Sequence, residues 1–128
     1  MTPEADRGLT AYHGTDIVSA RNLLRGAPLS TTEAAAQKID GPPGFFLATE
    51  ADDAIFFALR KAPSGVLEYQ LSSNAVEQLR GAGAVYRPIP PGKAIKFLGY
   101  EFYIPLEAFD LFNRLRAAGE IVIVPAGV

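Results

Sequence analysis

The sequence predicts one α+β domain, and three observations lead to that class. The chain has 128 residues, of which 48% are hydrophobic and 20% charged, which suits a single packed core. Short segments with strand-like alternation are mixed with short helical segments, and many of the links between them are of hairpin length. No regular strand–helix–strand rhythm is present, so a parallel sheet with crossover helices is not expected.

The first two elements are a strand and a helix. Leu9–His13 is expected to be a short strand that ends at Gly14. A helix is expected over Ile17–Leu24, where the apolar residues recur on one face, with Thr15 or Asp16 as its N-cap. A glycine two residues after this segment is the usual signal for a helix end.

A long loop separates this helix from the next strand. Ser30–Pro43 is small, polar and rich in turn residues, and prolines prevent a helix from continuing through it. We interpret it as a loop over a site. Phe45–Ala48 is expected to be a brief apolar strand, followed by a helix from Thr49 or Asp52 to about Lys61.

The second half of the chain is also expected to contain both strands and short helices. Val66–Leu71 alternates polar and apolar residues and is expected to be a strand, preceded by a turn over residues 63–65. Ser73 or Asn74 is expected to cap a short helix that ends at Arg80. The remaining expected elements are strands at Val85–Arg87, Ala94–Leu98 and Glu101–Ile104, a helix over Leu106–Ala117 and a strand at Ile121–Val124.

The composition of the chain and the motifs that it lacks argue against several kinds of function. The chain has no cysteine, one histidine and a net charge of −2 with scattered basic residues, so we expect neither disulfides nor a metal site nor a strong electrostatic grip on nucleic acid. Apolar residues never reach the run of roughly 18 that a membrane span needs, and the polar N-terminus does not resemble a signal peptide. The glycine patterns of dinucleotide-binding Rossmann folds, P-loops and serine hydrolases are absent.

Two segments carry side chains suited to binding. The first is Tyr12-His13-Gly14-Thr15, in which His13 closes a strand and the glycine allows a ligand to approach the backbone; the alternative is a strand-end histidine with a local hydrogen bond. The second is the strand with Phe45 and Phe46, whose side chains point to opposite faces, so one should enter the core and the other a cleft.

Two further residues complete the set of candidates. Phe57 lies eleven residues after Phe46 on the next helix, and two such rings can sandwich a flat heteroaromatic ring, although plain core packing also explains them. Glu101 stands alone among mostly apolar residues near a strand start, so it is either an edge charge or a site residue.

The order of these segments resembles the ADP-ribosyltransferase superfamily, in the His-Tyr-Glu branch that contains diphtheria toxin and the poly(ADP-ribose) polymerases. Residues 12–15 match the first motif of the diphtheria type, and residues 44–48 resemble the Gly-Ile-Tyr-Phe-Ala of the polymerases, with Phe46 at the tyrosine position. The eleven-residue step to Phe57 equals the family spacing of the two ring-stacking aromatics. Residues 100–104 resemble the strand of the catalytic glutamate.

The resemblance implies a fold, a co-substrate and roles for these residues. The fold would be compact, with two small, mainly antiparallel sheets around an NAD cleft and short flanking helices. Glu101 would bind the nicotinamide ribose and stabilise the cation formed on bond cleavage, with His13 as a second catalytic residue that holds the adenosine ribose. Gly14 and Thr15 would lie along the NAD, and Phe46 and Phe57 would stack the nicotinamide.

The chain departs from the family at three positions. Phenylalanine replaces both family tyrosines, at Phe46 and Phe57, which preserves stacking and removes the hydroxyls. Ala54 stands where the polymerases have a serine that helps hold the nicotinamide amide. Gly99 stands where the arginine-modifying branch carries a second Gln or Glu, which disfavours that branch.

The resemblance also implies partners and a setting. The expected activity is transfer of ADP-ribose from NAD, with no metal, to a macromolecular target, which the sequence does not identify. Small solitary domains of this branch are often bacterial toxins, either cytoplasmic or delivered into a target cell, with an antitoxin or immunity protein as partner. The alternatives are an NAD glycohydrolase, in which water is the acceptor, and a degenerate domain that binds NAD or a protein without turnover.

Overall fold

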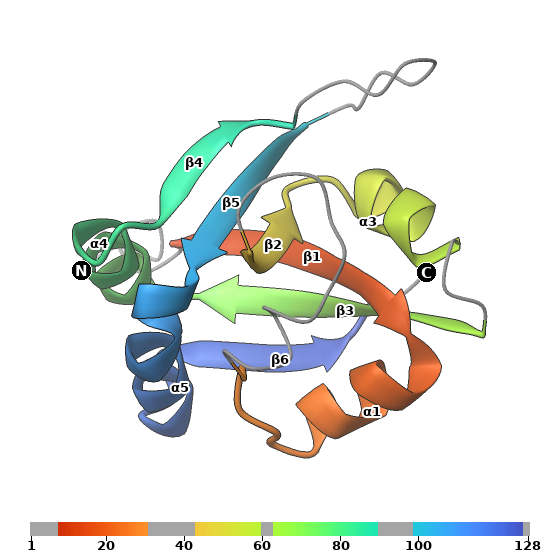
Figure 1. The fold of residues 1–128 in the computed structure, drawn as a ribbon, viewed down its shortest axis with the longest axis horizontal. Helices are drawn as coiled ribbons and strands as arrows, with labels where there is room; N and C mark the ends of the chain where they lie inside the picture. The colour runs from red at the N-terminus through yellow and green to blue at the C-terminus, as the bar shows by residue number, and fades with distance from the viewer. Residues whose placement is uncertain (1–7, 31–42, 60–62, 90–98, 127–128) are drawn as a thin grey trace.

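The computed structural model describes residues 8–30, 43–59, 63–89 and 99–126, and these form an α+β domain as expected. Figure 1 shows one six-stranded sheet, with four α-helices packed around it in the described part of the chain. The elements in chain order are β1 (Leu9–Asp16), α1 (Ile17–Leu24), β2 (Gly44–Ala48), α3 (Ala51–Ala58), β3 (Ser64–Leu71), α4 (Ser73–Gly81), β4 (Val85–Pro88), β5 (Tyr100–Pro105), the 3-10 turn η3 (Leu106–Ala108), α5 (Phe109–Ala117) and β6 (Ile121–Pro125).

The described strands form one sheet rather than the two small sheets that we expected. Its order is β4-β5-β2-β1-β3-β6, and every neighbouring pair is antiparallel. The expectation of two sheets fails because β1 and β2 are joined, but they are joined at a single register pair, Tyr12 with Ala48. We call this junction the seam. It divides the sheet into halves, and Figure 1 shows β4 and β5 inclined steeply to β3 and β6 across it.

Short-range signals account for the helix starts. The α1 helix has the expected bounds, and the Asp16 carboxylate accepts a hydrogen bond from the Ser19 amide at 2.8 Å, so Asp16 is the N-cap. The cap of α4 is Ser72, one residue before the two candidates named from the sequence, because its hydroxyl reaches the Ala75 amide at 3.0 Å. Gly26 follows α1 with a φ of 110°, the left-handed conformation that favours glycine after a helix.

Long-range pairing changes two boundaries. The first strand does not end at Gly14: it continues to Asp16, because its whole length pairs with β3 from Leu71 back to Ser64. The turn expected over residues 63–65 is for the same reason mostly strand. The expected strand Ala94–Leu98 and most of the loop Ser30–Pro43 lie outside the described residues.

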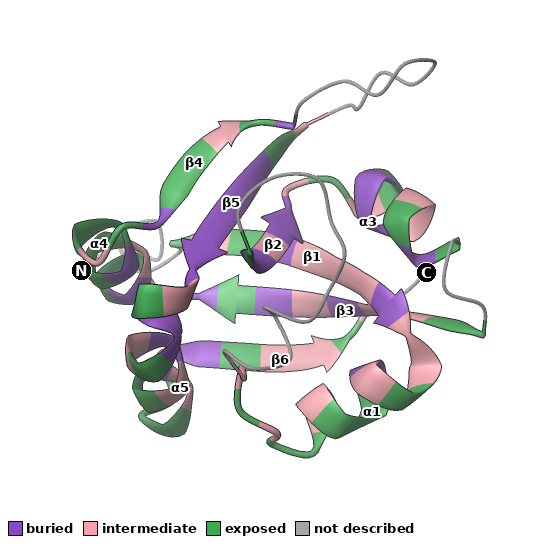
Figure 2. Ribbon diagram, viewed as in Figure 1, coloured by how far each residue is buried: buried purple, intermediate pink, exposed green. Residues whose placement is uncertain are grey.

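The main core lies on one face of the sheet, which helices α1, α4 and α5 cover. Figure 2 shows that β5 is almost entirely buried, whereas the edge strand β4 is mostly exposed. We call the opposite side the α3 face, because Ala54 of α3 packs there with Ala48 and Tyr12. The largest fully buried side chains of the main core are Tyr69, Phe102, Phe109, Phe112, Leu47, Leu67, Leu71, Leu79, Ile104 and Ile121.

Gly14 is required by packing. A Cβ placed there would lie 2.0 Å from the backbone oxygen of Ala54, so only glycine lets α3 pack directly on β1. We expect Gly14→Ala to lower the free energy of unfolding by about 1–3 kcal/mol.

Gly81→Ala is the matched control for that substitution. Gly81 ends α4, where an added Cβ meets nothing within 4 Å. The same substitution there should stabilise the fold by about 0.4–1 kcal/mol. Urea unfolding of both variants measures the difference, and changes of the same sign would contradict the packing of α3 on Gly14.

Candidate functional site

The fold places the candidate motifs on three neighbouring strands. His13 lies on β1, Phe46 on β2 and Glu101 on β5, and the sheet order sets these strands side by side. The seam runs between the first two, and β2 pairs with β5 along its whole length. Residues far apart in the sequence are therefore brought to one region of the sheet.

Glu101 is a buried carboxylate with a cationic partner. Only 6% of the residue is exposed. Glu101 pairs directly with Ala48 on β2 and with Arg87 on β4. Cross-strand partners share a face of the sheet, so its side chain is on the α3 face. The Arg87 Nε donates a hydrogen bond to Glu101 Oε2 at 2.7 Å. This ion pair compensates the cost of burying the charge.

Arg87 was not among the residues predicted for the site. Its guanidinium also lies over the ring of Tyr103, 4.9 Å from the centroid. Burial raises the pKa of the Tyr103 phenol, against the opposing charge of Arg87, so the hydroxyl stays protonated and donates to the Pro43 carbonyl at 3.0 Å. The one available signal in the sequence was a single arginine in an otherwise uncharged strand, which says nothing of its partner.

Phe45 and Phe46 point to opposite faces, as alternation predicts. Phe45 is 9% exposed and belongs to the main core. Phe46 is half-buried on the α3 face, where its ring lies 5.1 Å from that of Tyr103. Phe46 and Glu101 are therefore on the same face, with Tyr103 next to both.

His13 lies at the seam, and its ring is turned to the core side. Its Nδ1 is hydrogen-bonded to the Phe46 carbonyl oxygen at 2.9 Å, which bridges the two halves of the sheet. Because a carbonyl only accepts, Nδ1 carries the proton. The ring stacks on Phe45 at 4.2 Å and meets Tyr69 edge-on at 6.3 Å. His13 and Glu101 thus flank the seam from opposite faces of the sheet.

The other predicted binding residues surround the seam. Gly14 faces α3, and Thr15 is 5% exposed beside the α1 cap. Phe57, on α3, is 37% exposed, and its ring is edge-on to Phe56 at 6.0 Å. The Phe46 ring lies on the α3 face, and Phe57 belongs to the helix that packs on that face.

A polar clamp fixes the start of β5, just before Glu101. The Gly99 amide donates to the buried Asp53 carboxylate at 2.9 Å, and the Tyr100 amide donates to the Thr49 hydroxyl at 2.9 Å. A Cβ at Gly99 would lie 2.5 Å from that hydroxyl oxygen, so glycine is needed for this close approach. The clamp links the start of β5 to α3 and to the residues just before it, and so fixes the position of Glu101 along β5.

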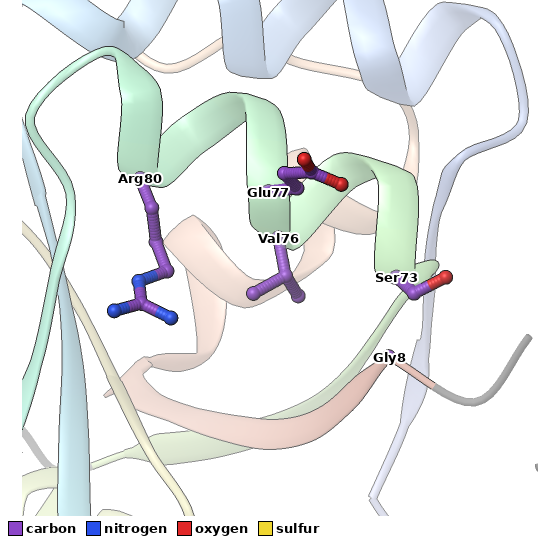
Figure 3. A pocket seen from close by; sticks show the side chains of 5 residues that line it. All are labelled: Gly8, Ser73, Val76, Glu77 and Arg80. Atoms are coloured by element: carbon purple, nitrogen blue, oxygen red, sulfur yellow. The ribbon is translucent and has the colours of Figure 1, made fainter. Parts of the chain in front are cut away.

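A surface hollow elsewhere shares no residue with this region. It has a volume of about 470 Å³ and is lined by Gly8, Ser73, Val76, Glu77 and Arg80. Figure 3 shows Val76 and Arg80 projecting from α4 toward the start of β1. Its lining includes no buried charged residue, whereas the seam region has Glu101. The seam region is therefore the better candidate for a functional site.

Within residues 8–30, 43–59, 63–89 and 99–126, no group of three or more His, Cys, Asp or Glu side chains is arranged to hold a metal ion. None of the helices in those ranges is long and apolar enough to cross a membrane.

Comparison with known proteins adds no assignment to this geometry. No family model, curated protein or solved structure matches the chain. The function must therefore be inferred from the residues at the seam and from the motifs that they form.

Proposed function

We propose that the chain is an NAD-dependent ADP-ribosyltransferase with an ADP-ribosyltransferase-like fold. The observation that carries this proposal is that three motifs lie around the seam, with Phe46 and Glu101 on the α3 face and the His13 ring on the core side. His13, Phe46 and Glu101 come from distant parts of the sequence and stand on the adjacent strands β1, β2 and β5.

The buried carboxylate suits the chemistry of nicotinamide release. Breaking the nicotinamide–ribose bond develops positive charge on the ribose, as in glycoside cleavage. The nicotinamide leaves as a neutral molecule, so no general acid is required. A fixed negative charge in a water-poor setting stabilises such a cation, and Glu101 is the candidate for that role.

The remaining residues have binding roles in this proposal. Phe46 and Phe57 stack the nicotinamide ring from β2 and α3. His13, whose Nδ1 donates a hydrogen bond to the Phe46 carbonyl oxygen, holds the adenosine ribose. The Gly14 backbone holds the carboxamide, with Thr15 next to it on β1.

The acceptor is proposed to be a macromolecule, and the chain a bacterial toxin domain with an antitoxin or immunity protein as partner. The test is to incubate the chain with cell lysate and NAD labelled on the adenylate, and to follow the label. We expect label on protein or nucleic acid. Label found only in free ADP-ribose would replace transfer by NAD glycohydrolysis. NAD left intact in every lysate would overturn the proposal in favour of a binding domain.

A further inference from the structure

Arg87 has no role in the proposed reaction, yet it holds the residue on which that reaction depends. We propose that Arg87 binds the diphosphate of the dinucleotide, and that its guanidinium is shared between this diphosphate and Glu101. The inference rests on the proposed function for the identity of the dinucleotide. It adds a phosphate-binding residue that none of the sequence motifs contains.

The guanidinium has donors available for a second anion. Its Nε binds Glu101 Oε2 at 2.7 Å. Arginine carries four more N–H donors on its two Nη atoms, in a planar fork that fits phosphate oxygens. Among the described residues, Glu101 is the only ion-pair partner of Arg87. The arginine therefore has donors for a phosphate as well as for the carboxylate, and the two anions compete for its single positive charge.

The two partners differ in exposure, which decides which of them can move. The Glu101 side chain is 9% exposed and that of Arg87 is 36% exposed. Glu101 is fixed by the clamp at the start of β5, whereas Arg87 is on the edge strand β4. A solvent-borne diphosphate can thus draw the guanidinium outward, whereas the carboxylate stays in place.

The distribution of positive charge supports the same choice. The other described arginines lie on or directly after helices α1, α4 and α5, and none is on a strand. Arg87 is therefore the one cation of the described sheet, and it adjoins the carboxylate assigned to the ribose. In a dinucleotide the nicotinamide ribose is bonded directly to the diphosphate, so adjacent residues should hold adjacent groups.

Sharing has a consequence for catalysis. While Arg87 neutralises Glu101, the carboxylate stabilises a ribose cation poorly, because the net charge of the pair is zero. A bound diphosphate competes for the guanidinium and restores the negative charge beside the ribose. Arg87 would then make the strength of Glu101 depend on the correct ligand.

Calorimetric titration with ADP tests the sharing, since ADP carries the diphosphate and cannot react. Arg87→Gln should weaken ADP binding roughly 10- to 100-fold, the range for a charge-assisted hydrogen bond. Glu101→Gln should tighten it about fivefold or more, because the arginine loses its competing partner. The gain should vanish when Glu101→Gln is made in the Arg87→Gln background.

Controls separate sharing from simpler effects. Adenosine, which lacks phosphate, should bind all variants equally, and Arg114→Gln, an exposed arginine on α5, should leave ADP binding unchanged. If Arg87→Gln does not fold, Arg87→Lys keeps the charge and should weaken ADP to a smaller extent. Equal ADP affinity in wild type and Glu101→Gln, or a gain that persists without Arg87, would overturn the inference, as would a wild type that does not bind ADP.

The titration can overturn the shared arginine without overturning the proposed function, and the reverse also holds. The expected pattern of ADP affinities in a protein that leaves NAD intact would support the shared arginine and overturn the transferase. Turnover of NAD without that pattern would retain the transferase and overturn the sharing.

Discussion

Glu101→Gln is expected to lower the rate of nicotinamide release about 10²- to 10³-fold, with a smaller effect on the affinity for NAD. Glutamine keeps the size of the side chain and one hydrogen-bonding oxygen, and removes the charge. If that charge stabilises the ribose cation, the loss falls on the transition state and therefore on kcat. Steady-state kinetics of nicotinamide release, with thermal unfolding on the same preparation, measure both effects.

Stability separates this result from damage to the fold. The substitution breaks the ion pair with Arg87, whose side chain is 36% exposed and can be solvated. We therefore expect Glu101→Gln to remain folded. Glu107→Gln is the matched control, because Glu107 is an exposed acid six residues further on, in η3. Turnover of Glu101→Gln equal to that of the control would remove Glu101 from the mechanism.

Phe45→Ala is expected mainly to destabilise the fold, whereas Phe46→Ala is expected mainly to weaken ligand binding. Phe45 is packed between His13, Tyr69 and Phe112, with ring centroids at 4.2–5.9 Å, and its truncation should cost about 3–5 kcal/mol of unfolding free energy. Phe46 is half-buried on the α3 face, so Phe46→Ala should lower the free energy of unfolding by less than Phe45→Ala does. Denaturant unfolding of the two variants gives this comparison directly.

Ligand binding should rank the same two variants in the opposite order. NAD raises the melting temperature of a protein that binds it only when folded. Phe46→Ala should lose most of that rise, because the nicotinamide loses one stacking ring. Phe45→Ala, measured at a temperature where it is folded, should keep more of it. The reverse ranking would mean that Phe45, with His13, forms the ring-binding surface.

Local signals in the sequence predicted the α+β class and the positions of most described elements, but not the single six-stranded sheet. The bounds of α1, its cap at Asp16 and the opposite orientation of Phe45 and Phe46 follow from neighbours within one turn or one strand. The extension of β1 past Gly14 was missed, because it depends on pairing with a strand some fifty residues later. A glycine after a strand indicates a turn unless a helix packs on it, and α3 does.

The candidate site was predictable as a list of residues and not as an arrangement. Glu101 is unusual enough in its segment to be identified alone, but Arg87 becomes its partner only through the register of β4 with β5. Asp53 had no signal beyond its place in the first turn of a helix, although its carboxylate holds the start of β5. The seam is likewise a property of sheet order, which no segment carries by itself.

The buried hydroxyl of Tyr69 shows how the core and the seam are connected. Within the described residues this oxygen has no hydrogen-bond partner. Burial raises the pKa of the Tyr69 phenol, and the nearby charge of Arg116 offsets this only in part, so the group is neutral. Its ring contacts both His13 and Phe45, which fixes the imidazole at the seam.

The most direct test of the central claim is the release of nicotinamide from NAD by the purified chain, measured with and without cell lysate. We expect nicotinamide to appear at a rate that depends on Glu101, and to appear faster when lysate supplies the acceptor. If the folded chain leaves NAD intact under both conditions, then Glu101, His13 and Phe46 do not form an ADP-ribosyltransferase site.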